Sequence, residues 1–215
     1  MGKAFNKMHK SAPNIHWSED QQTIFYVGEP VQLKKISKMC QAINKELQEM
    51  LKWLMFDEAV PDIDLGQVTD SMAWSQEFRR DEYSFIQHPQ NKHLDIGYQG
   101  LLSRARKARG KRQMMKKGVG GEDEWIKHRV DAYLTVEKRF LRKGMGGVHV
   151  EYGQPARGPE IGSIKVSNSI YSARNMYVIN GRLCILTMYD KARKRRGNTE
   201  YIVRFLPDEL SQIFV

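Results

Sequence analysis

The dipeptide Asn180-Gly181, set between two short apolar runs, constrains the fold of this chain more than any other feature. Both residue types adopt positive φ angles readily, as the central pair of a tight β-hairpin turn requires. The pattern therefore predicts strands over residues 176–179 and 183–189. A third apolar run over residues 201–206 completes an antiparallel three-stranded meander, and Pro207 begins a short C-terminal helix.

The sequence before this meander is rich in helical patterns. Apolar residues recur every three or four positions over residues 36–54, which predicts one amphipathic helix that Pro30 opens and Pro61 ends. A second helix is expected over residues 69–80. Residues 83–91 are expected to be extended or irregular.

Two more helices are predicted, one from about Tyr98 and one from about Ile126. The acids Glu122-Asp123-Glu124 favour the start of the later helix, because negative charge complements the positive end of the helix dipole. The glycines of residues 144–147 are expected to end it. With helices first and a small antiparallel sheet last, the predicted fold class is α+β.

The chain carries 35 lysine and arginine residues against 25 acids, a formal net charge of +10 over 215 residues. A basic excess of this size indicates a polyanionic partner, nucleic acid first and an acidic membrane surface second. No segment approaches the ~18 apolar residues of a membrane span, and the first ten residues lack the apolar core of a secretory signal. We therefore expect no membrane and a nuclear location, with the cytoplasm as second choice.

The two cysteines, Cys40 and Cys184, and the six histidines are scattered through the sequence. No Cys-x-x-Cys or Cys/His spacing of a zinc site occurs, so no metal ion and no other cofactor is expected. Both cysteines stand in apolar surroundings and are expected to fill the core. The same is expected of Trp53, Trp74 and Trp125, rather than a role as base-stacking platforms.

Basic residues concentrate in two tracts. Eight of the fourteen residues over 104–117 are lysine or arginine and none is acidic, and a second cluster follows the predicted hairpin at residues 191–196. The first tract fits a solvated or disordered stretch, a clamp on DNA phosphates or a nuclear import signal, and these interpretations stay open. The candidate DNA-binding residues are Arg104, Arg106, Lys107, Arg109, Lys111, Arg112, Arg193, Lys194, Arg195 and Arg196.

An ordered set of short motifs runs through the last third of the chain. It begins with Gly153-Gln154-Pro155-Ala156-Arg157-Gly158-Pro159-Glu160-Ile161 and continues over residues 174–178, 180–183, 188–191 and 202–207. The first segment resembles the Arg-x-x-Glu box of tyrosine recombinases. The whole set resembles more closely the recombinase-like region of fungal crypton-type mobile elements and of fungal proteins that join this region to a RecQ-type helicase. The resemblance is stronger over residues 145–215 than over residues 70–144.

The resemblance implies that Arg157 and Lys191 belong to a phosphoryl-transfer site in which a tyrosine attacks DNA. Arg157 would bind the non-bridging phosphate oxygens, since a guanidinium offers paired donors and keeps its charge. It is expected just before a helix start, with Pro159 in the first turn. Lys191, or Lys194 as the alternative, would act as general acid on the leaving oxygen. Glu160 is expected to hold the guanidinium of Arg157 in place.

The family's site also needs a His-x-x-Arg box and a tyrosine nucleophile on later helices. No histidine follows Lys191, and Tyr201 lies on the third predicted strand. We therefore expect residues 148–215 to be a truncated recombinase-like catalytic subdomain that is inactive alone, after a flexible N-terminus over residues 1–20 and a mainly helical DNA-binding-like region over residues 21–147. The expected partner is double-stranded DNA. The resemblance also implies a helicase region in a longer native protein and a homo-oligomer on DNA.

Three alternatives stay open. In the first, the chain is an active strand-transferase that a longer chain or a partner completes. In the second, it is an interaction module that docks a partner on the apolar face of residues 31–56. In the third, it is an RNA-binding module. A covalent protein–DNA adduct would indicate the first. Burial of the apolar face within the monomer would count against the second, and competition between RNA and duplex DNA separates the third.

Overall fold

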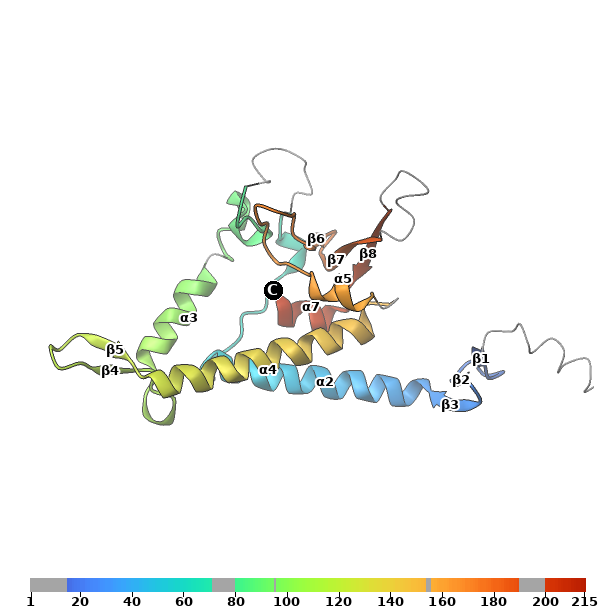
Figure 1. The fold of residues 1–215 in the computed structure, drawn as a ribbon, viewed down its shortest axis with the longest axis horizontal. Coiled ribbons are helices and arrows are strands. Elements are labelled where there is room, and N and C mark those ends of the chain that lie inside the picture. Colours follow the sequence, from blue (N-terminus) through green and yellow to red (C-terminus); the bar gives the residue numbers. More distant parts are fainter. Residues whose placement is uncertain (1–14, 71–79, 95, 154–155, 190–199) are drawn as a thin grey trace, which may run out of the picture. The chain divides into compact units, whose positions relative to one another are not determined.

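A computed structural model describes residues 15–70, 80–94, 96–153, 156–189 and 200–215 of the chain (Figure 1). These residues form helices and antiparallel sheets, with helix on the N-terminal side and a three-stranded sheet near the C-terminus, so the α+β prediction is confirmed. Most of the helix predicted over residues 69–80 lies outside the described residues. The chain divides into two compact units, residues 1–45 and 46–215.

The first unit contains an antiparallel sheet that the sequence analysis missed. Its strands, in spatial order, are β1 (Ile15–Trp17), β2 (Thr23–Tyr26) and β3 (Glu29–Gln32). Val27 and Gly28, with φ angles of 51° and 87°, form the tight turn between β2 and β3. Pro30 therefore lies in an edge strand, where a sheet tolerates proline, and the prediction that it opens a helix was wrong. Strand β1 falls within the segment expected to be flexible.

Helix α2 (Leu33–Leu54) carries the predicted apolar stripe. Leu47 and Leu54 of this stripe, both in the second unit, are buried, whereas Met39 in the first unit is 45% exposed. Their burial counts against the alternative in which this part of the helix docks a partner protein.

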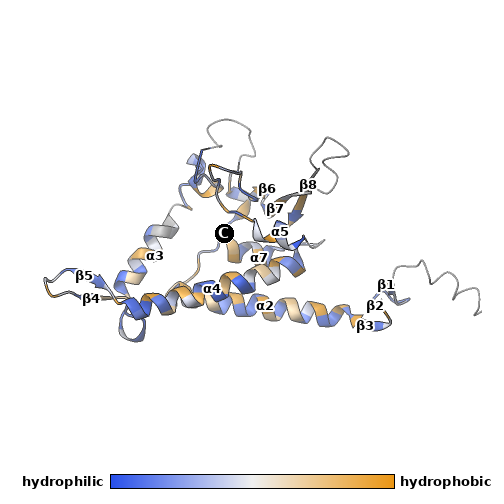
Figure 2. Cartoon of the chain, viewed as in Figure 1, coloured by the Kyte–Doolittle hydropathy of each residue, from blue (hydrophilic) through white to orange (hydrophobic). Residues whose placement is uncertain are grey.

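Helix α4 (Lys127–Glu151) lies antiparallel to the last turns of α2 (Figure 1). Lys143 forms an ion pair with Glu46 near one end of this contact, and the Tyr133 hydroxyl donates a hydrogen bond to the Leu54 carbonyl at 3.1 Å near the other. Apolar and polar residues alternate along both helices, as expected of helices with one buried face (Figure 2).

Helix α4 continues through the glycines of residues 144–147, so the prediction that these glycines end it was wrong. The reason lies in side-chain packing. A Cβ atom on Gly144 would meet Cζ of Phe214 at 2.4 Å, whereas a Cβ atom on Gly146 would meet nothing within 4 Å. Gly144 thus lets helix α7 (Asp208–Phe214) approach α4 closely.

We expect Gly144→Val to destabilise the protein by about 1–3 kcal/mol, because overpacking forces the Phe214 ring or the helix to shift. The matched change Gly146→Ala, at an exposed position of the same helix, is expected to stabilise it by about 0.5–1 kcal/mol through helix propensity. Urea unfolding measures both changes. A Gly144→Val variant as stable as wild type would argue against the close approach of α7.

The basic tract over residues 104–117 has regular structure through most of its length. Helix α3 (Ile96–Lys107), predicted from about Tyr98, ends inside the tract. A 3-10 turn, η5 (Gly110–Arg112), follows and leads into strand β4 (Met115–Lys117). The interpretation of this tract as a disordered stretch is therefore wrong.

Strand β4 pairs with β5 (Asp123–Trp125) in a short hairpin before α4. The acids predicted at the start of the helix lie opposite lysines here: Lys117 pairs with Asp123 at 2.9 Å and Lys116 with Glu124 at 3.5 Å. Opposite charges across a strand pair favour strand pairing. Helix α4 accordingly begins only after β5.

The predicted meander is confirmed. Strands β6 (Met176–Ile179), β7 (Arg182–Tyr189) and β8 (Glu200–Phe205) form an antiparallel sheet in that order, and α7 packs on β7. Asn180 and Gly181 have φ angles of 51° and 72°, as the predicted tight turn requires. The sheet and the chain after it contribute buried apolar side chains to the core: Leu183, Cys184, Ile185, Leu206, Leu210 and Ile213.

Among the described residues, three further 3-10 turns connect these elements: η1 (Leu65–Gln67), η3 (Phe85–Gln87) and η4 (Pro89–Asn91). The last two agree with the irregular structure predicted for this stretch. Asn91 is fully buried, and its amide donates to the carbonyls of Thr69 and Phe85 at 2.6 and 2.7 Å while accepting the Thr69 N–H at 2.9 Å. One side chain thereby fixes two distant loops.

Candidate nucleic-acid interface

Five basic side chains from the end of α3, from η5 and from the residues between them line one pocket of about 400 Å³. All five are predicted DNA-binding residues: Arg104, Lys107, Arg109, Lys111 and Arg112. The chain that follows α2 supplies Phe56 and Glu58 to the same pocket. Glu58 is the one carboxylate among the described lining residues, and Asp57 places a second carboxylate on Arg112, so five positive charges stand against two negative charges.

Arg104 and Arg112 are held by neighbours at the end of α2 and just beyond it. Nε of Arg104 lies 2.8 Å from the Glu58 carboxylate, and Nη1 of Arg112 lies 2.8 Å from the Asp57 carboxylate. The Arg112 guanidinium also lies over the Trp53 ring, 5.1 Å from its centroid. These two arginines join α3 and η5 to the end of α2, and their charge is partly neutralised there.

Lys107, Arg109 and Lys111 are exposed at this pocket. Arg109 donates to the backbone carbonyls of Arg106 and Ala108 at 3.0 and 3.1 Å. Within the described parts of the chain, no carboxylate lies within ion-pair distance of these three cations. Their charge is therefore open to an external anion.

The positive field extends from this pocket to the neighbouring hairpin. Lys117 lowers the pKa of Asp123 by its hydrogen bond and its charge, and Arg106 and Arg109 add to the effect. Arg106 is exposed beside the pocket without lining it. All six DNA-binding candidates of the first basic tract thus contribute positive charge to the same region of the second unit.

Arg157 is exposed and caps the N-terminus of the short helix α5 (Gly158–Gly162), with Pro159 in its first turn, as predicted. The Glu160 carboxylate accepts a hydrogen bond from the backbone N–H of Arg157 at 3.4 Å. This contact is to the backbone, so the expected contact between the carboxylate and the guanidinium stays a prediction.

The second basic tract falls outside the described residues. It contains the predicted general acid and the remaining DNA-binding candidates, Lys191, Arg193, Lys194, Arg195 and Arg196. Their position relative to Arg157 is therefore also a prediction.

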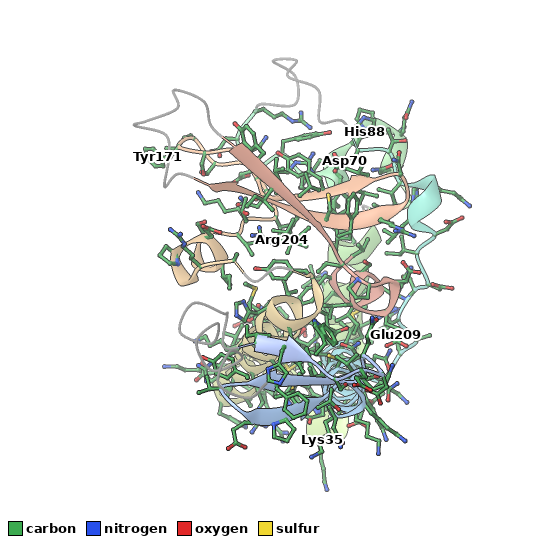
Figure 3. The ribbon with its side chains drawn as sticks, turned by 90° about the vertical axis from the view of Figure 1, so that its right-hand side faces the viewer. Lys35, Asp70, His88, Tyr171, Arg204 and Glu209 are labelled. Atoms are coloured by element: carbon green, nitrogen blue, oxygen red, sulfur yellow. The ribbon has the colours of Figure 1, made fainter. Side chains whose placement is uncertain are left out.

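A buried ion pair that the sequence analysis missed fixes strand β6. The side chains of Arg174 and Asp70 are 2% and 0% exposed. Asp70, beside the β6–β7–β8 sheet in Figure 3, accepts hydrogen bonds from both Nη atoms of Arg174 and from the Val178 N–H, the last at 2.8 Å. The guanidinium lies 4.2 Å from the centroid of the Tyr177 ring. Arg174 is thus engaged in the interior and does not contribute to an anion site.

Burial raises the pKa of Cys184 to about 11, and the nearby Asp70 carboxylate adds to the effect. The thiol is fully buried and stays protonated at neutral pH, so Cys184 fills the core as predicted and is not a nucleophile. Over the described ranges, no group of three His, Cys, Asp or Glu side chains is placed to hold a metal ion.

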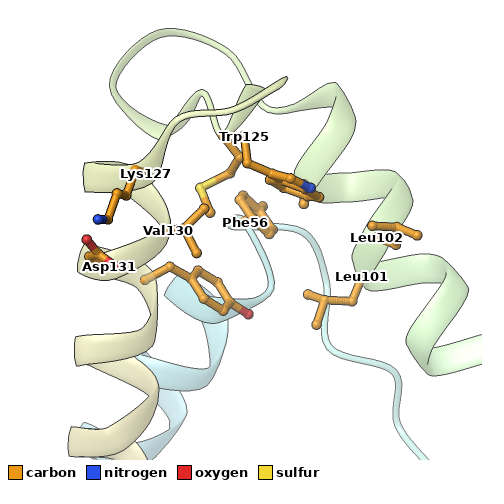
Figure 4. A pocket seen from close by; sticks show the side chains of 10 residues that line it. Phe56, Leu101, Leu102, Trp125, Lys127, Val130 and Asp131 are labelled. Carbon is orange, nitrogen blue, oxygen red and sulfur yellow. The ribbon is translucent and has the colours of Figure 1, made fainter. Parts of the chain in front are cut away.

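Trp125 does not fill the core as predicted. The residue is 46% exposed, and it lines an apolar pocket of about 480 Å³ (Figure 4). Trp53 is half-buried and stacks on Tyr133, with 5.9 Å between the ring centroids. Trp74 lies outside the described residues. Because all four tryptophans stand in mixed sequence, no local pattern separated Trp125 from the others.

Neither a protein-family model nor a solved structure matches this chain. The likeness to tyrosine recombinases therefore rests on the motifs alone and stays a prediction. None of the helices in the described part of the chain combines the length and the apolar character that crossing a membrane requires.

Proposed function

We propose that this protein binds DNA through phosphate contacts made by the basic pocket at the end of α3. The observation that carries the proposal is the convergence of five basic side chains on one concave site, with a single carboxylate among the described residues that line it. A concave surface of one charge focuses the electric field and raises the local concentration of a polyanion. The formal net charge of +10 favours the same kind of partner.

The basic residues of this pocket have two different roles. Arg104 and Arg112 are ordered by their carboxylate partners and give the pocket its shape. Lys107, Arg109 and Lys111 are exposed and supply charge to the phosphates. Ammonium and guanidinium groups both form short, charge-assisted hydrogen bonds with phosphate oxygens. We therefore expect about three phosphate contacts, one for each exposed cation.

Binding of this kind reads no base sequence, because phosphate contacts set position and carry no sequence information. The motif resemblance adds to the proposal a descent from a tyrosine recombinase and a nuclear location, without strand cleavage by this chain alone. A duplex suicide substrate tests the last point: we expect no covalent adduct, and an adduct would show that the chain retains strand-transfer activity.

The binding itself is tested by the fluorescence anisotropy of a labelled duplex of about 20 base pairs, titrated with the protein at several salt concentrations. We expect a Kd on the order of 10⁻⁶–10⁻⁴ M near physiological salt, and a slope of log Kd against log salt of about 2.7, since each phosphate contact contributes about 0.9. Binding no stronger than that of a neutral control protein, or a Kd independent of salt, would refute the proposal. Duplex RNA that displaces the DNA at equal or lower concentration would assign the site to RNA instead.

A further inference from the structure

A second pocket adjoins the basic pocket. Leu101, Leu102 and Met114 form its aliphatic wall, and Phe56, Trp125 and Tyr133 form its aromatic wall (Figure 4). Phe56 lines both pockets, so the two cavities share one wall. With a volume of about 480 Å³, the apolar pocket has the size of a site for a small ligand.

Helix α3 contributes to both pockets from successive residues. Leu102 and Ala105 line the apolar pocket, whereas Arg104 and Lys107 line the basic pocket. A ligand that fills both must therefore carry an apolar group close to an anionic group. A nucleotide within a DNA strand has this composition, with a flat base on one side and phosphates on the other.

The aromatic wall is left partly open to solvent. Trp125 is 46% exposed although it stands beside an apolar cavity. The rings of Phe56 and Tyr133 are stacked, with 5.7 Å between centroids and 13° between planes. Exposed apolar surface at the mouth of a pocket marks a binding site. Flat aromatic faces are the surfaces on which unpaired bases stack.

The backbone at the shared wall is strained. Phe56 and Asp57 have φ angles of 60° and 63°, in the left-handed region that residues other than glycine rarely adopt. The Asp57 N–H donates to the Lys52 carbonyl at 2.9 Å, which holds this conformation at the end of α2. The Phe56 ring lies between the two pockets, and the Asp57 carboxylate forms an ion pair with Arg112. Strained residues concentrate at binding sites, and this pair lies at the junction of two.

We propose that the two pockets together bind an unpaired segment of DNA, with one base in the apolar pocket and its neighbouring phosphates in the basic pocket. A base inside a duplex is stacked on its neighbours, so only a single strand or an extruded base can enter. The inference rests on the proposed function, because the basic pocket supplies the phosphate contacts.

The test compares two labelled strands of equal length and charge, one a thymidine oligonucleotide and the other an abasic oligonucleotide that keeps the phosphates and lacks the bases. We expect wild type to bind the thymidine strand about tenfold more tightly, the contribution of one stacked base. Trp125→Ala should remove this preference and leave binding of the abasic strand unchanged. Trp125→Phe, which keeps an aromatic face, should retain most of it.

The matched control is Trp17→Ala, at a tryptophan of the first unit that is 53% exposed and outside both pockets. This variant should bind both strands as wild type does. Equal binding of the two strands by wild type, or an unchanged preference in Trp125→Ala, would overturn the inference and leave the proposed function standing. Absence of salt-dependent binding to either strand and to duplex DNA would overturn both.

Discussion

Replacing Arg174 by alanine is expected to lower the free energy of unfolding by about 3–5 kcal/mol, which is a large part of the stability of an ordinary domain. The change leaves the Asp70 carboxylate, 0% exposed, without its guanidinium partner. An uncompensated charge in the interior is far more costly than the loss of a neutral hydrogen bond. The Met176 carbonyl also loses its donor, Nη1 of Arg174, at 3.0 Å.

Urea unfolding followed by circular dichroism measures this loss. The control is Arg142→Ala on an exposed position of α4, which we expect to change stability by no more than about 0.5 kcal/mol. The double variant Asp70→Asn with Arg174→Met should lose less than Arg174→Ala alone, because no unpaired charge remains. If Arg174→Ala unfolds at the same urea concentration as the control, the buried pair does not hold β6 in place.

The second large effect is expected on DNA affinity. Replacing Lys107, Arg109 and Lys111 together by glutamine should weaken duplex binding by about 10²- to 10³-fold at ~0.1 M salt. Between ~1 M and ~0.1 M salt, each phosphate contact increases the affinity for DNA by about 0.9 decade. The loss of three contacts therefore lowers the affinity at ~0.1 M salt by about 2.7 decades. All three side chains are exposed, so the variant should keep the fold.

A matched variant separates the pocket from the overall charge. Lys34, Lys35 and Lys38 are exposed on α2 in the first unit, and their replacement by glutamine removes the same three charges. We expect this variant to bind duplex DNA within a few fold of wild type. Equal losses in the two triple variants would mean that net charge, and not the pocket, governs the affinity.

Local sequence was sufficient where a short segment determines its own conformation. The turn at Asn180-Gly181 requires positive φ angles that these residue types adopt at little cost, and β6 and β7 follow from the apolar runs beside it. Helix α7 after Pro207 and the apolar stripe of α2 were predicted for the same reason.

The predicted local structure was wrong where a contact between residues far apart in the sequence determines it. Glycines that end an isolated helix are kept inside α4 because Phe214, about seventy residues along the chain, packs on Gly144. That helix also runs across the boundary placed between residues 147 and 148. Acids that fit a helix start became strand residues because Lys116 and Lys117 lie opposite them. The acids do favour a helix start, but their pairing with the lysines of β4 favours the strand more strongly.

The candidate site shows the same division. The basic residues could be identified from the sequence, because a run of like charges is recognisable without a structure. It did not show that they surround a pocket, because Phe56 and Glu58 reach that pocket from about fifty residues upstream. The ion pair of Asp70 and Arg174 spans more than one hundred residues and has no local pattern. The open face of Trp125 likewise depends on how β5 and α3 pack around a cavity.

The salt dependence of duplex binding tests the central claim most directly, because it counts the phosphate contacts that each variant makes. For wild type and for the α2 variant at residues 34, 35 and 38, we predict a slope of log Kd against log salt of about 2.7. For the pocket variant at residues 107, 109 and 111 we predict a slope near zero. An unchanged slope in the pocket variant would contradict the claim that this site holds the DNA backbone.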